Sequence, residues 1–316
     1  MSTQNIRDLV IVGGGPAGLS ASLYAARALL DTVTLEQEAV GGQAILTSEI
    51  DNYPGLPHTD GFSLSDAMKG QAEEFGADIR MEDVRSIERD DTTGIFTVAT
   101  SSGSYASKAV ILAGGASPRE AGFEGEREFR GHGVSYCATC DGMFYRGKQV
   151  FVVGGGNSAC EEALFLSKFA SKVTLLVRKD HLRATALVAR EVSQNPKLEV
   201  RFNTSLVSVT GGTLLSGVTL RDNLSGRETT EKYDEGSFGV FVFVGRVPGS
   251  SFVEGLAELD PRGYVVTDDH MATRTPGLYA AGDVRRTPLR QVITAASDGA
   301  VAATSVATFL GQPLEG

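Results

Sequence analysis

The segment "IVGGGPAGLSASLYAARA", residues 11–28, places a glycine-rich turn between an apolar strand and a helical pattern. Its glycines Gly13, Gly15 and Gly18 fit G-x-G-x-x-G, which permits a tight turn, close backbone approach to a pyrophosphate and tight helix–strand packing. The free N–H groups of the helix N-terminus also attract phosphate. The next predicted strand ends at Glu36, where an acid can bind a ribose hydroxyl. A glycine turn of any α/β protein is the alternative, but strand, helix and acid together favour a dinucleotide fold.

The same pattern returns in "KQVFVVGGGNSACEEALFLSKFASKVTLLVRKDHLR", residues 148–183. It predicts a strand over 149–153, a loop with Gly154, Gly156 and Ala159, a helix to about Phe169 and a strand over 173–177. Two copies in one chain indicate two dinucleotide sites, or one working copy and one relic.

The two copies differ where the ribose is recognised. Val177 stands at the position that matches Glu36, and Arg178, Lys179 and Arg183 follow it. Cations in place of an acid favour a 2′-phosphate and hence NADP, whereas an acid favours a free ribose, as in FAD. The alternative for the cations is a solvated basic patch at a strand end.

Strand patterns alternate with helical ones along most of the chain, which predicts α/β architecture with doubly wound parallel sheets. A helix is expected over 63–76 and another over 290–310, and the stretch 203–237, rich in Thr, Ser and Gly, is expected to form a meander of short strands. A length of 316 residues suits about two domains.

Charge and segment composition limit the partners and the compartment. A net charge of −10 argues against nucleic acid or an anionic membrane surface as the partner. No apolar run reaches the roughly 20 residues that a membrane span needs. A strand is already predicted at residues 9–12, which leaves no room for a secretory signal. We expect a cytoplasmic protein without a metal.

Cys137 and Cys140 form a C-x-x-C pair in a chain that holds three cysteines in all. Structural zinc needs four ligands, and apart from this pair the chain has Cys160 and scattered histidines. A core pair without chemistry is a second alternative. A redox dithiol is the third, because this spacing lets two sulfurs meet in one loop and lowers one thiol pKa. The pair is not expected to open a helix after a first strand, as it would in a thioredoxin, and Cys160 is expected to pack in a core.

Asp141 directly follows the pair. A carboxylate beside a dithiol can carry the proton that accompanies reduction of a disulfide. A helix N-cap or turn residue is the alternative for Asp141. A dithiol together with two dinucleotide sites predicts an electron route from NADPH through a flavin to a disulfide.

At this point the sequence resembles the low-molecular-weight thioredoxin reductases of the bacterial type, nearly from end to end. The resemblance is carried by "GGGPAGLSASLYAARA", "GGQAILTSEIDNYPG", "GVSYCATCDGMFYRGK", "GGGNSACEEALFLSKFASKVTLL", "TPGLYAAGDV" and "RQVITAASDGAVAA". It implies a discontinuous FAD domain over 1–115 and 247–316, with an NADPH domain over 116–246 inserted and carrying the redox disulfide.

The resemblance also implies residues for each cofactor and for the chemistry. FAD is expected at Gly13, Gly15, Pro16, Ala17, Gly18, Glu36, Gly41, Gly42, Gln43, Asn52, Val84, Gly282, Asp283, Arg290, Gln291 and Val292. NADPH is expected at Gly154, Gly156, Asn157, Ser158, Ala159, Arg178, Lys179 and Arg183. Cys137 and Cys140 are expected to form the redox disulfide, Cys140 meeting the flavin and Cys137 the protein substrate, with Asp141 as acid and base.

By the same resemblance we expect a homodimer whose substrate is oxidised thioredoxin. Its domains are expected to swivel at linkers near 115–118 and 244–248, so that nicotinamide and disulfide meet the flavin in turn. The family usually has His-Arg-Arg at 177–179, and Lys179 lacks the planar fork of arginine, which weakens the preference for NADPH. It commonly has two aromatics where this chain has Met143 and Phe144, and often a tyrosine at Leu289.

Two other readings remain. One keeps the flavin and dithiol but uses NADH, ferredoxin or oxygen as the electron partner, or another small dithiol protein. The other is a flavin-bound sensor without turnover. The second glycine fingerprint and its cations argue against ferredoxin and oxygen as electron partners, and a sensor has little use for a second complete nucleotide fold.

Overall fold

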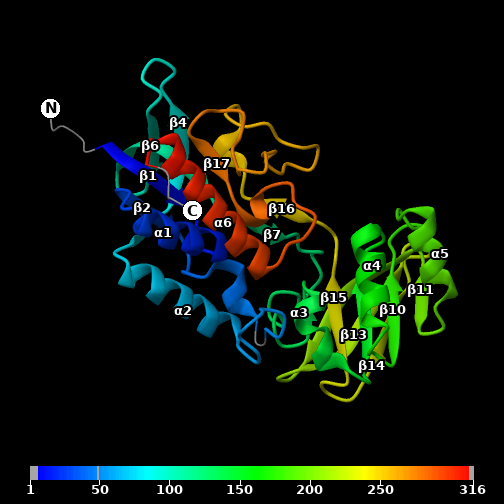
Figure 1. The fold of residues 1–316 in the computed structure, drawn as a ribbon. Helices are drawn as coiled ribbons and strands as arrows, with labels where there is room; N and C mark the ends of the chain where they lie inside the picture. Colours follow the sequence, from blue (N-terminus) through cyan, green and yellow to red (C-terminus); the bar gives the residue numbers. More distant parts are fainter. Residues whose placement is uncertain (1–5, 48–49, 313–316) are drawn as a thin grey trace. The chain divides into compact units, whose positions relative to one another are not determined.

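The computed structural model describes residues 6–47 and 50–312 of the chain (Figure 1). The chain divides into two compact units. Unit 1 consists of Met1–Ser117 together with Val247–Gly316, and unit 2 is Pro118–Arg246. The expected boundaries followed residues 115 and 246, and the chain divides after residues 117 and 246. Each unit has its own sheet and core, and each is described by itself.

Unit 1 is built on a mixed sheet with the order β3-β2-β1-β6-β5-β4 and with β17 also paired to β6. Its central strands are parallel, whereas β4 and β5 form an antiparallel edge. The bounds are β1 Ile6–Val12, β2 Thr32–Glu36, β3 Asp78–Met81, β4 Val84–Arg89, β5 Phe96–Thr100, β6 Ser104–Leu112 and β17 Leu278–Ala280. The apolar run Leu9–Val12 is buried because a central parallel strand is covered on both faces.

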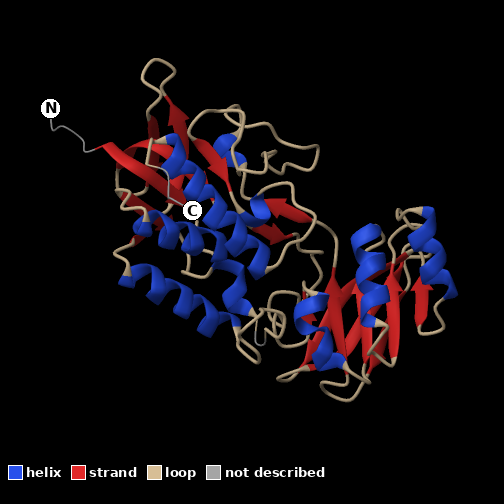
Figure 2. Cartoon of the chain, viewed as in Figure 1, coloured by secondary structure: helices blue, strands red, loops and turns tan. Residues whose placement is uncertain are grey.

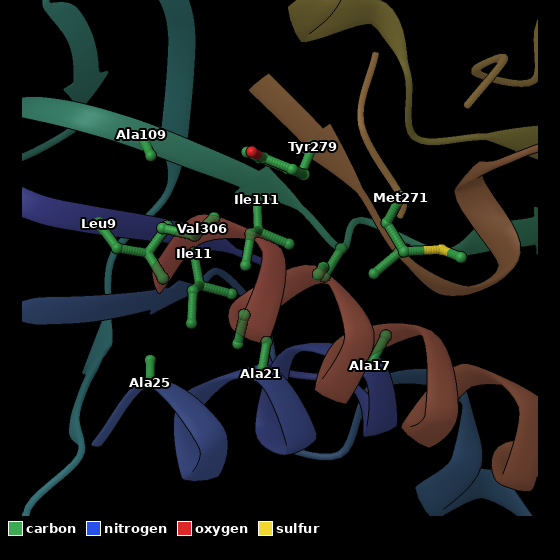
Figure 3. Close-up of a cluster of buried hydrophobic side chains, with 14 of the residues drawn as sticks. Leu9, Ile11, Ala17, Ala21, Ala25, Ala109, Ile111, Met271, Tyr279 and Val306 are labelled. Atoms are coloured by element: carbon green, nitrogen blue, oxygen red, sulfur yellow. The ribbon is translucent and has the colours of Figure 1, made fainter. Parts of the chain in front are cut away.

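Helices cover the sheet of unit 1 (Figure 2). They are α1 Pro16–Arg27, α2 Gly61–Glu74 and α6 Val292–Phe309, with 3₁₀ turns η1 Gly42–Leu46, η3 Ser251–Val253 and η4 Gly282–Val284. In Figure 3 Ala17, Ala21 and Ala25, four residues apart on α1, face the same core as Leu9 and Ile11 of β1. Small side chains on α1 allow α6 to pack closely against it, and Val306 of α6 enters this core.

Among the described residues, α6 is the one helix whose length and composition would also suit a membrane span. The same helix carries the charged residue Asp298, which is buried, and packs its alanine face on α1. A helix that is apolar over most of its surface is equally typical of the centre of a globular domain.

Unit 2 contains a second sheet, which is parallel throughout and has the order β11-β10-β9-β15-β8. The strands are β8 Val134–Ser135, β9 Gln149–Val153, β10 Lys172–Leu176, β11 Leu198–Arg201 and β15 Phe238–Val242, with helices α4 Asn157–Leu166 and α5 Ala186–Gln194. The second glycine pattern thus forms the expected strand–loop–helix–strand unit, and the chain has two doubly wound α/β units.

The expected meander is an antiparallel sheet of β12 Thr204–Gly211, β13 Leu215–Asp222 and β14 Glu228–Lys232. It covers one face of the parallel sheet of unit 2, where Phe151 and Phe238 pack edge to face. The opposite face is covered by α4, whose Cys160 is fully buried among apolar side chains.

The helix expected to reach about Phe169 ends earlier, at Leu166. The hydroxyl of Ser167 donates to the carbonyl oxygen of Leu164, and the backbone N–H groups of Lys168 and Phe169 donate to carbonyls three residues earlier, so the last turn tightens. The helix expected to begin at residue 290 begins at Val292, because the side chain of Gln291 caps it in a reciprocal bond with Thr294.

Candidate active site

The first glycine loop has the shape that a bound pyrophosphate requires. A Cβ on Gly18 would collide with the carbonyl oxygen of Gly13, and Gly13 itself has φ +111° beside the backbone of Ala113. At Gly15, by contrast, a Cβ would meet nothing within 4 Å. Gly15 is the N-cap of α1 and provides no side-chain cap, so no N-cap side chain occupies the N–H groups of the first turn.

Further expected FAD residues surround this loop. A carboxylate oxygen of Glu36, at the end of β2, accepts a hydrogen bond of 2.7 Å from the backbone N–H of Gly14. The N–H of Gly41 donates to the carbonyl of Gly14, and a Cβ on Gly42 would lie 3.2 Å from Gly15. Residues 41–43 therefore lie against the glycine loop, as a segment that binds the same ligand would.

Val84 has a different environment from the other members of the expected FAD set. Its side chain is buried in the core of unit 1 together with Val33 and Leu35 of β2. The backbone at the start of β4 is thus the part of Val84 that is left for a ligand.

The C-terminal segment of unit 1 supplies the rest of the set. Asn52 donates from its amide to the side-chain oxygen of Gln291, 3.0 Å away, which joins residues far apart in the chain. The guanidinium of Arg290 lies over the ring of Tyr264, 4.2 Å from its centroid. Arg290 Nε is buried and has no hydrogen-bond partner among the described residues, so it can donate to a bound ligand.

The sequence reasoning missed the side chains that hold the Gly282–Val284 turn. Asp298 of α6 accepts two hydrogen bonds from the guanidinium of Arg285, at 2.6 and 3.0 Å, and one from the N–H of Gly282. This buried pair fixes the turn that carries Asp283 against α6. A tertiary contact between residues 13 positions apart leaves no local signal in the sequence.

Taken together, the expected FAD residues of unit 1 fit a dinucleotide. The uncapped N-terminus of α1 and Arg290 Nε offer hydrogen-bond donors to acceptor atoms of a ligand, and the open face at Gly15 leaves room for it. Glu36, Asp283 and Gln291 add acceptors or amides in the same unit. The chemistry of these residues fits FAD.

The second glycine loop repeats the design of the first. Gly154 has φ +149°, while a Cβ on Gly156 would meet nothing within 4 Å. Gly156 is the N-cap of α4, again without a side-chain cap, and Asn157 and Ser158 are exposed in the first turn. The N–H of Arg183 donates to the carbonyl of Gly155, so the basic segment returns to the loop.

The ribose position of the second copy contains no acid. The buried side chain of Val177 fills it, and a Cβ on Gly155 would lie 2.8 Å from Val177 Cγ1. Arg178, Lys179 and Arg183 are all exposed around the loop. Three exposed cations beside the loop can pair with a negatively charged group of a ligand.

The cysteine pair opens a helix, contrary to expectation. The short strand β8 leads into α3, Ala138–Asp141, with Cys137 as its N-cap residue. The backbone N–H of Cys140 donates to Cys137 Sγ at 3.2 Å, so the sulfur itself caps the first turn. The two sulfurs are bonded as a disulfide. Spacing alone did not predict the helix because α3 is one turn long and is followed at once by the 3₁₀ turn η2, Gly142–Tyr145.

The carboxyl of Asp141 points to Ser135 and does not cap a helix. Its Oδ2 accepts a hydrogen bond of 2.6 Å from Ser135 Oγ, and its N–H donates to the carbonyl of Cys137. Asp141 precedes η2 but forms no side-chain cap there, which removes the alternative role as a helix N-cap. Burial raises the pKa of Asp141, and the Ser135 bond lowers it in part. A carboxyl with a raised pKa is suited to proton transfer near neutral pH.

The other readings of the cysteines find little support in the structure. Within residues 6–47 and 50–312, no group of three or more His, Cys, Asp or Glu could hold a metal ion. Cys160 is fully buried in the core of unit 2, and burial raises the pKa of its thiol to about 11. Cys160 is therefore an unreactive packing residue, as expected.

Comparison with known proteins is consistent with this geometry. Residues 7–299 match the family described as pyridine nucleotide-disulphide oxidoreductase. The chain is 44% identical over 316 residues to a thioredoxin reductase of Peptoclostridium acidaminophilum, covering 99% of both chains. It is 47% identical over 304 residues to one of Treponema pallidum, covering 96% of this chain and 97% of that protein. The solved thioredoxin reductase of Streptococcus pyogenes superposes with a TM-score of 0.90 at 39% identity, over 98% of this chain and 99% of that one.

Proposed function

The chain belongs to the pyridine nucleotide-disulphide oxidoreductase family, and from this premise we propose that it is an NADPH-dependent thioredoxin-disulfide reductase. Electrons pass from NADPH through FAD and the Cys137–Cys140 disulfide to oxidised thioredoxin. The observation that carries the proposal is the disulfide itself, which lies beside the half-buried carboxyl of Asp141 in the unit that also contains the second glycine loop.

Unit 1 provides the residues for FAD. When bound, FAD supplies a carrier that takes two electrons from a nicotinamide and gives them to a disulfide. The N–H groups at the start of α1 bind its pyrophosphate, and Glu36 binds a ribose hydroxyl. Arg290 and Gln291, at the start of α6, orient the flavin end.

Unit 2 provides the residues for NADPH and for the protein substrate. The N-terminus of α4 binds the pyrophosphate, and Arg178, Lys179 and Arg183 bind the 2′-phosphate. Two electrons break the S–S bond between Cys137 and Cys140, and each sulfur needs one proton to become a thiol. Cys137, once a thiolate, attacks one sulfur of the thioredoxin disulfide, and the other thioredoxin sulfur leaves and takes a proton. Cys140, as a thiolate, then attacks Cys137 Sγ in this mixed disulfide, which re-forms the Cys137–Cys140 bond and releases the second thioredoxin sulfur.

Asp141 moves the proton in this sequence. In its ionised form the carboxylate accepts a proton from a thiol, which leaves the thiolate that attacks. In its protonated form it returns a proton when a sulfur leaves. The enzyme is proposed to act in the cytoplasm. It is also proposed to be a homodimer, so sedimentation velocity should give a mass twice that of one chain.

A spectrum of the purified protein and a pair of cysteine variants test the function. The wild-type protein should show flavin absorbance that NADPH bleaches and oxidised thioredoxin restores. Cys140→Ser should still bleach with NADPH but lose steady-state thioredoxin reduction. Cys160→Ala removes a thiol of the same unit outside the pair and should keep turnover. Full turnover by Cys140→Ser, or a faster reaction with reduced ferredoxin than with NADPH, would refute the proposed route.

A further inference from the structure

We propose that Ser135 is a positioning residue that holds the Asp141 carboxyl beside the Cys137–Cys140 pair and favours its ionised, proton-accepting form. The inference deepens the proposed function, because it rests on Asp141 as the proton carrier of a disulfide reductase. Ser135 lies at the end of β8, two residues before the first cysteine, and its side chain is 5% exposed.

The hydroxyl of Ser135 is oriented by two bonds of different kinds. It accepts a hydrogen bond of 3.1 Å from the backbone N–H of Cys137. Its own proton then points to Asp141 Oδ2 at 2.6 Å, in preference to the carbonyl of Cys137 at 3.3 Å. A hydroxyl proton aimed at a carboxylate stabilises the charged form of the acid. The same side chain therefore joins the backbone of the cysteine loop to the carboxyl.

The Asp141 carboxyl has little other support among the described residues. Leu166 and Phe169 pack against the adjacent Gly142, and burial raises the pKa of Asp141. Without a donor, burial alone would act on the carboxyl and favour its protonated form, which cannot accept a proton. The Ser135 bond opposes that effect and lowers the pKa of Asp141.

Other titratable groups lie around Asp141, and none provides this bond. Burial raises the pKa of Tyr145 of η2 to about 12, and the nearby charge of Asp141 adds to this effect. The Tyr145 hydroxyl is therefore neutral. Lys148 lies over the ring of Tyr145. Helix α4 packs against α3 and carries Cys160, Glu161 and Glu162, of which the thiol is neutral and the acids would add only negative charge.

Replacement of Ser135 should therefore move a pH dependence. In Ser135→Ala the pKa of Asp141 is expected to rise, because its carboxylate loses the hydroxyl donor. The acid limb of the pH profile for thioredoxin reduction should move to higher pH, while the rate on the alkaline side of the limb stays near that of wild type. Ser135→Thr keeps the hydroxyl and should return the limb toward its original position. A purely structural role would lower the rate equally at all pH values.

The pairing can also be measured without turnover. The oxidised flavoprotein, labelled with ¹³C at the aspartate carboxyls, can be titrated by NMR, with the Asp141 signal assigned from Asp141→Asn. Ser135→Ala should raise the pKa of this signal, whereas Ser167→Ala, which removes another buried hydroxyl of unit 2, should not. An unchanged Asp141 pKa in Ser135→Ala would overturn the inference even if thioredoxin is reduced. A raised pKa without any thioredoxin reduction by wild type would instead refute the proposed function.

A wild-type measurement guards against a variant that fails to fold. The hydroxyl proton of Ser135 should produce a deuterium isotope shift at the Asp141 carboxyl carbon when water is exchanged for heavy water. Absence of that shift in folded wild-type protein would also overturn the inference.

Discussion

The proposed role of Asp141 in proton transfer requires an ionised carboxylate, whereas the stability of the folded protein favours a protonated one. The folded-state pKa of Asp141 is raised by burial above the ordinary value, which is close to that of the unfolded chain. Such a group contributes stability below the unfolded pKa and loses it as the pH rises through the folded pKa. Ionisation of the Asp141 carboxyl in the native protein therefore disfavours folding.

The first prediction is that Asp141→Asn unfolds at a higher temperature than wild type at pH 7 while thioredoxin reduction falls. The gain in melting temperature should shrink as the pH is lowered from 7 toward 4, because protonation of the wild-type carboxyl removes the cost of its ionisation. Calorimetry across this pH range measures the melting temperatures of wild type and Asp141→Asn. Asp91→Asn, at an almost fully exposed side chain, serves as the control and should change the unfolding free energy by less than about 0.5 kcal/mol. A lower melting temperature for Asp141→Asn at pH 7 would contradict the prediction.

A second prediction concerns the exposed cations of the second glycine loop. Removing Arg178 or Lys179 should lower kcat/KM for NADPH by about tenfold each, because a charge-assisted bond to phosphate is lost. The value for NADH should change little, since NADH lacks the 2′-phosphate. Arg227→Ala, an exposed arginine between β13 and β14, is the matched control. Equal losses with NADPH and NADH would show that these residues do not bind the phosphate.

Residue identities could be predicted where a short motif fixes the chemistry. The pair Cys137–Cys140 and the glycines of both loops were found in this way. Ser135 and Asp298 were not, because each acts through a hydrogen bond whose partner is defined only by the folded chain. Tyr264, which lies beneath Arg290, is a similar case. Spacing in the sequence gives no measure of such contacts.

At the scale of elements, the contact between α1 and α6 depends on the absence of one side chain. A Cβ on Gly299 of α6 would collide with the carbonyl oxygen of Ala17. Gly70 of α2, by contrast, has nothing within 4 Å of a built Cβ. The two glycines occupy helices of the same unit but differ in the space beside them.

The third prediction is that alanine has opposite effects at these two glycines. Gly299→Ala should lower the free energy of unfolding by about 1–3 kcal/mol, because overpacking outweighs the gain in helix propensity. Gly70→Ala should raise it by about 0.5–1 kcal/mol, since the propensity gain is unopposed. Urea unfolding of both variants measures the difference. A stabilised Gly299→Ala protein would mean that α6 does not pack on α1 as described.

Most elements could be predicted from periodicity, because strands and helices in this chain alternate in long, clear patterns. The exception with functional weight is α3, a single turn that Cys137 Sγ caps. A helix of four residues has no periodicity to detect. The end of α4 at Leu166 was also missed, since it depends on a local bond of Ser167.

On the scale of the whole molecule, the two units differ in how the chain builds their cores. Every buried cluster of unit 2 is drawn from the continuous stretch Pro118–Arg246. The cores of unit 1 combine residues from both of its segments, with β17 and α6 completing the sheet and its cover.

The fourth prediction follows from this difference. A fragment of residues 118–246 should fold alone, unfold cooperatively and bind NADP⁺, as circular dichroism and calorimetric titration can measure. A fragment of residues 1–117 should remain largely unfolded, because it lacks α6 and β17. Folding of both fragments, or of neither, would contradict the assignment of independent cores.

The two junctions between the units lie close together, which affects how unit 2 can be exchanged. Short strands β7, Ala116–Pro118, and β16, Arg246–Pro248, pair with each other, and the N–H of Gly249 donates to the carbonyl of Gly115 at 3.0 Å. The chain therefore leaves unit 1 before the inserted stretch and returns to unit 1 after it at adjacent backbone positions. Pro118–Arg246 is thus an insertion with neighbouring ends. We expect that another α/β domain with neighbouring termini, or a tight turn, can take its place without a change in the chain path of unit 1.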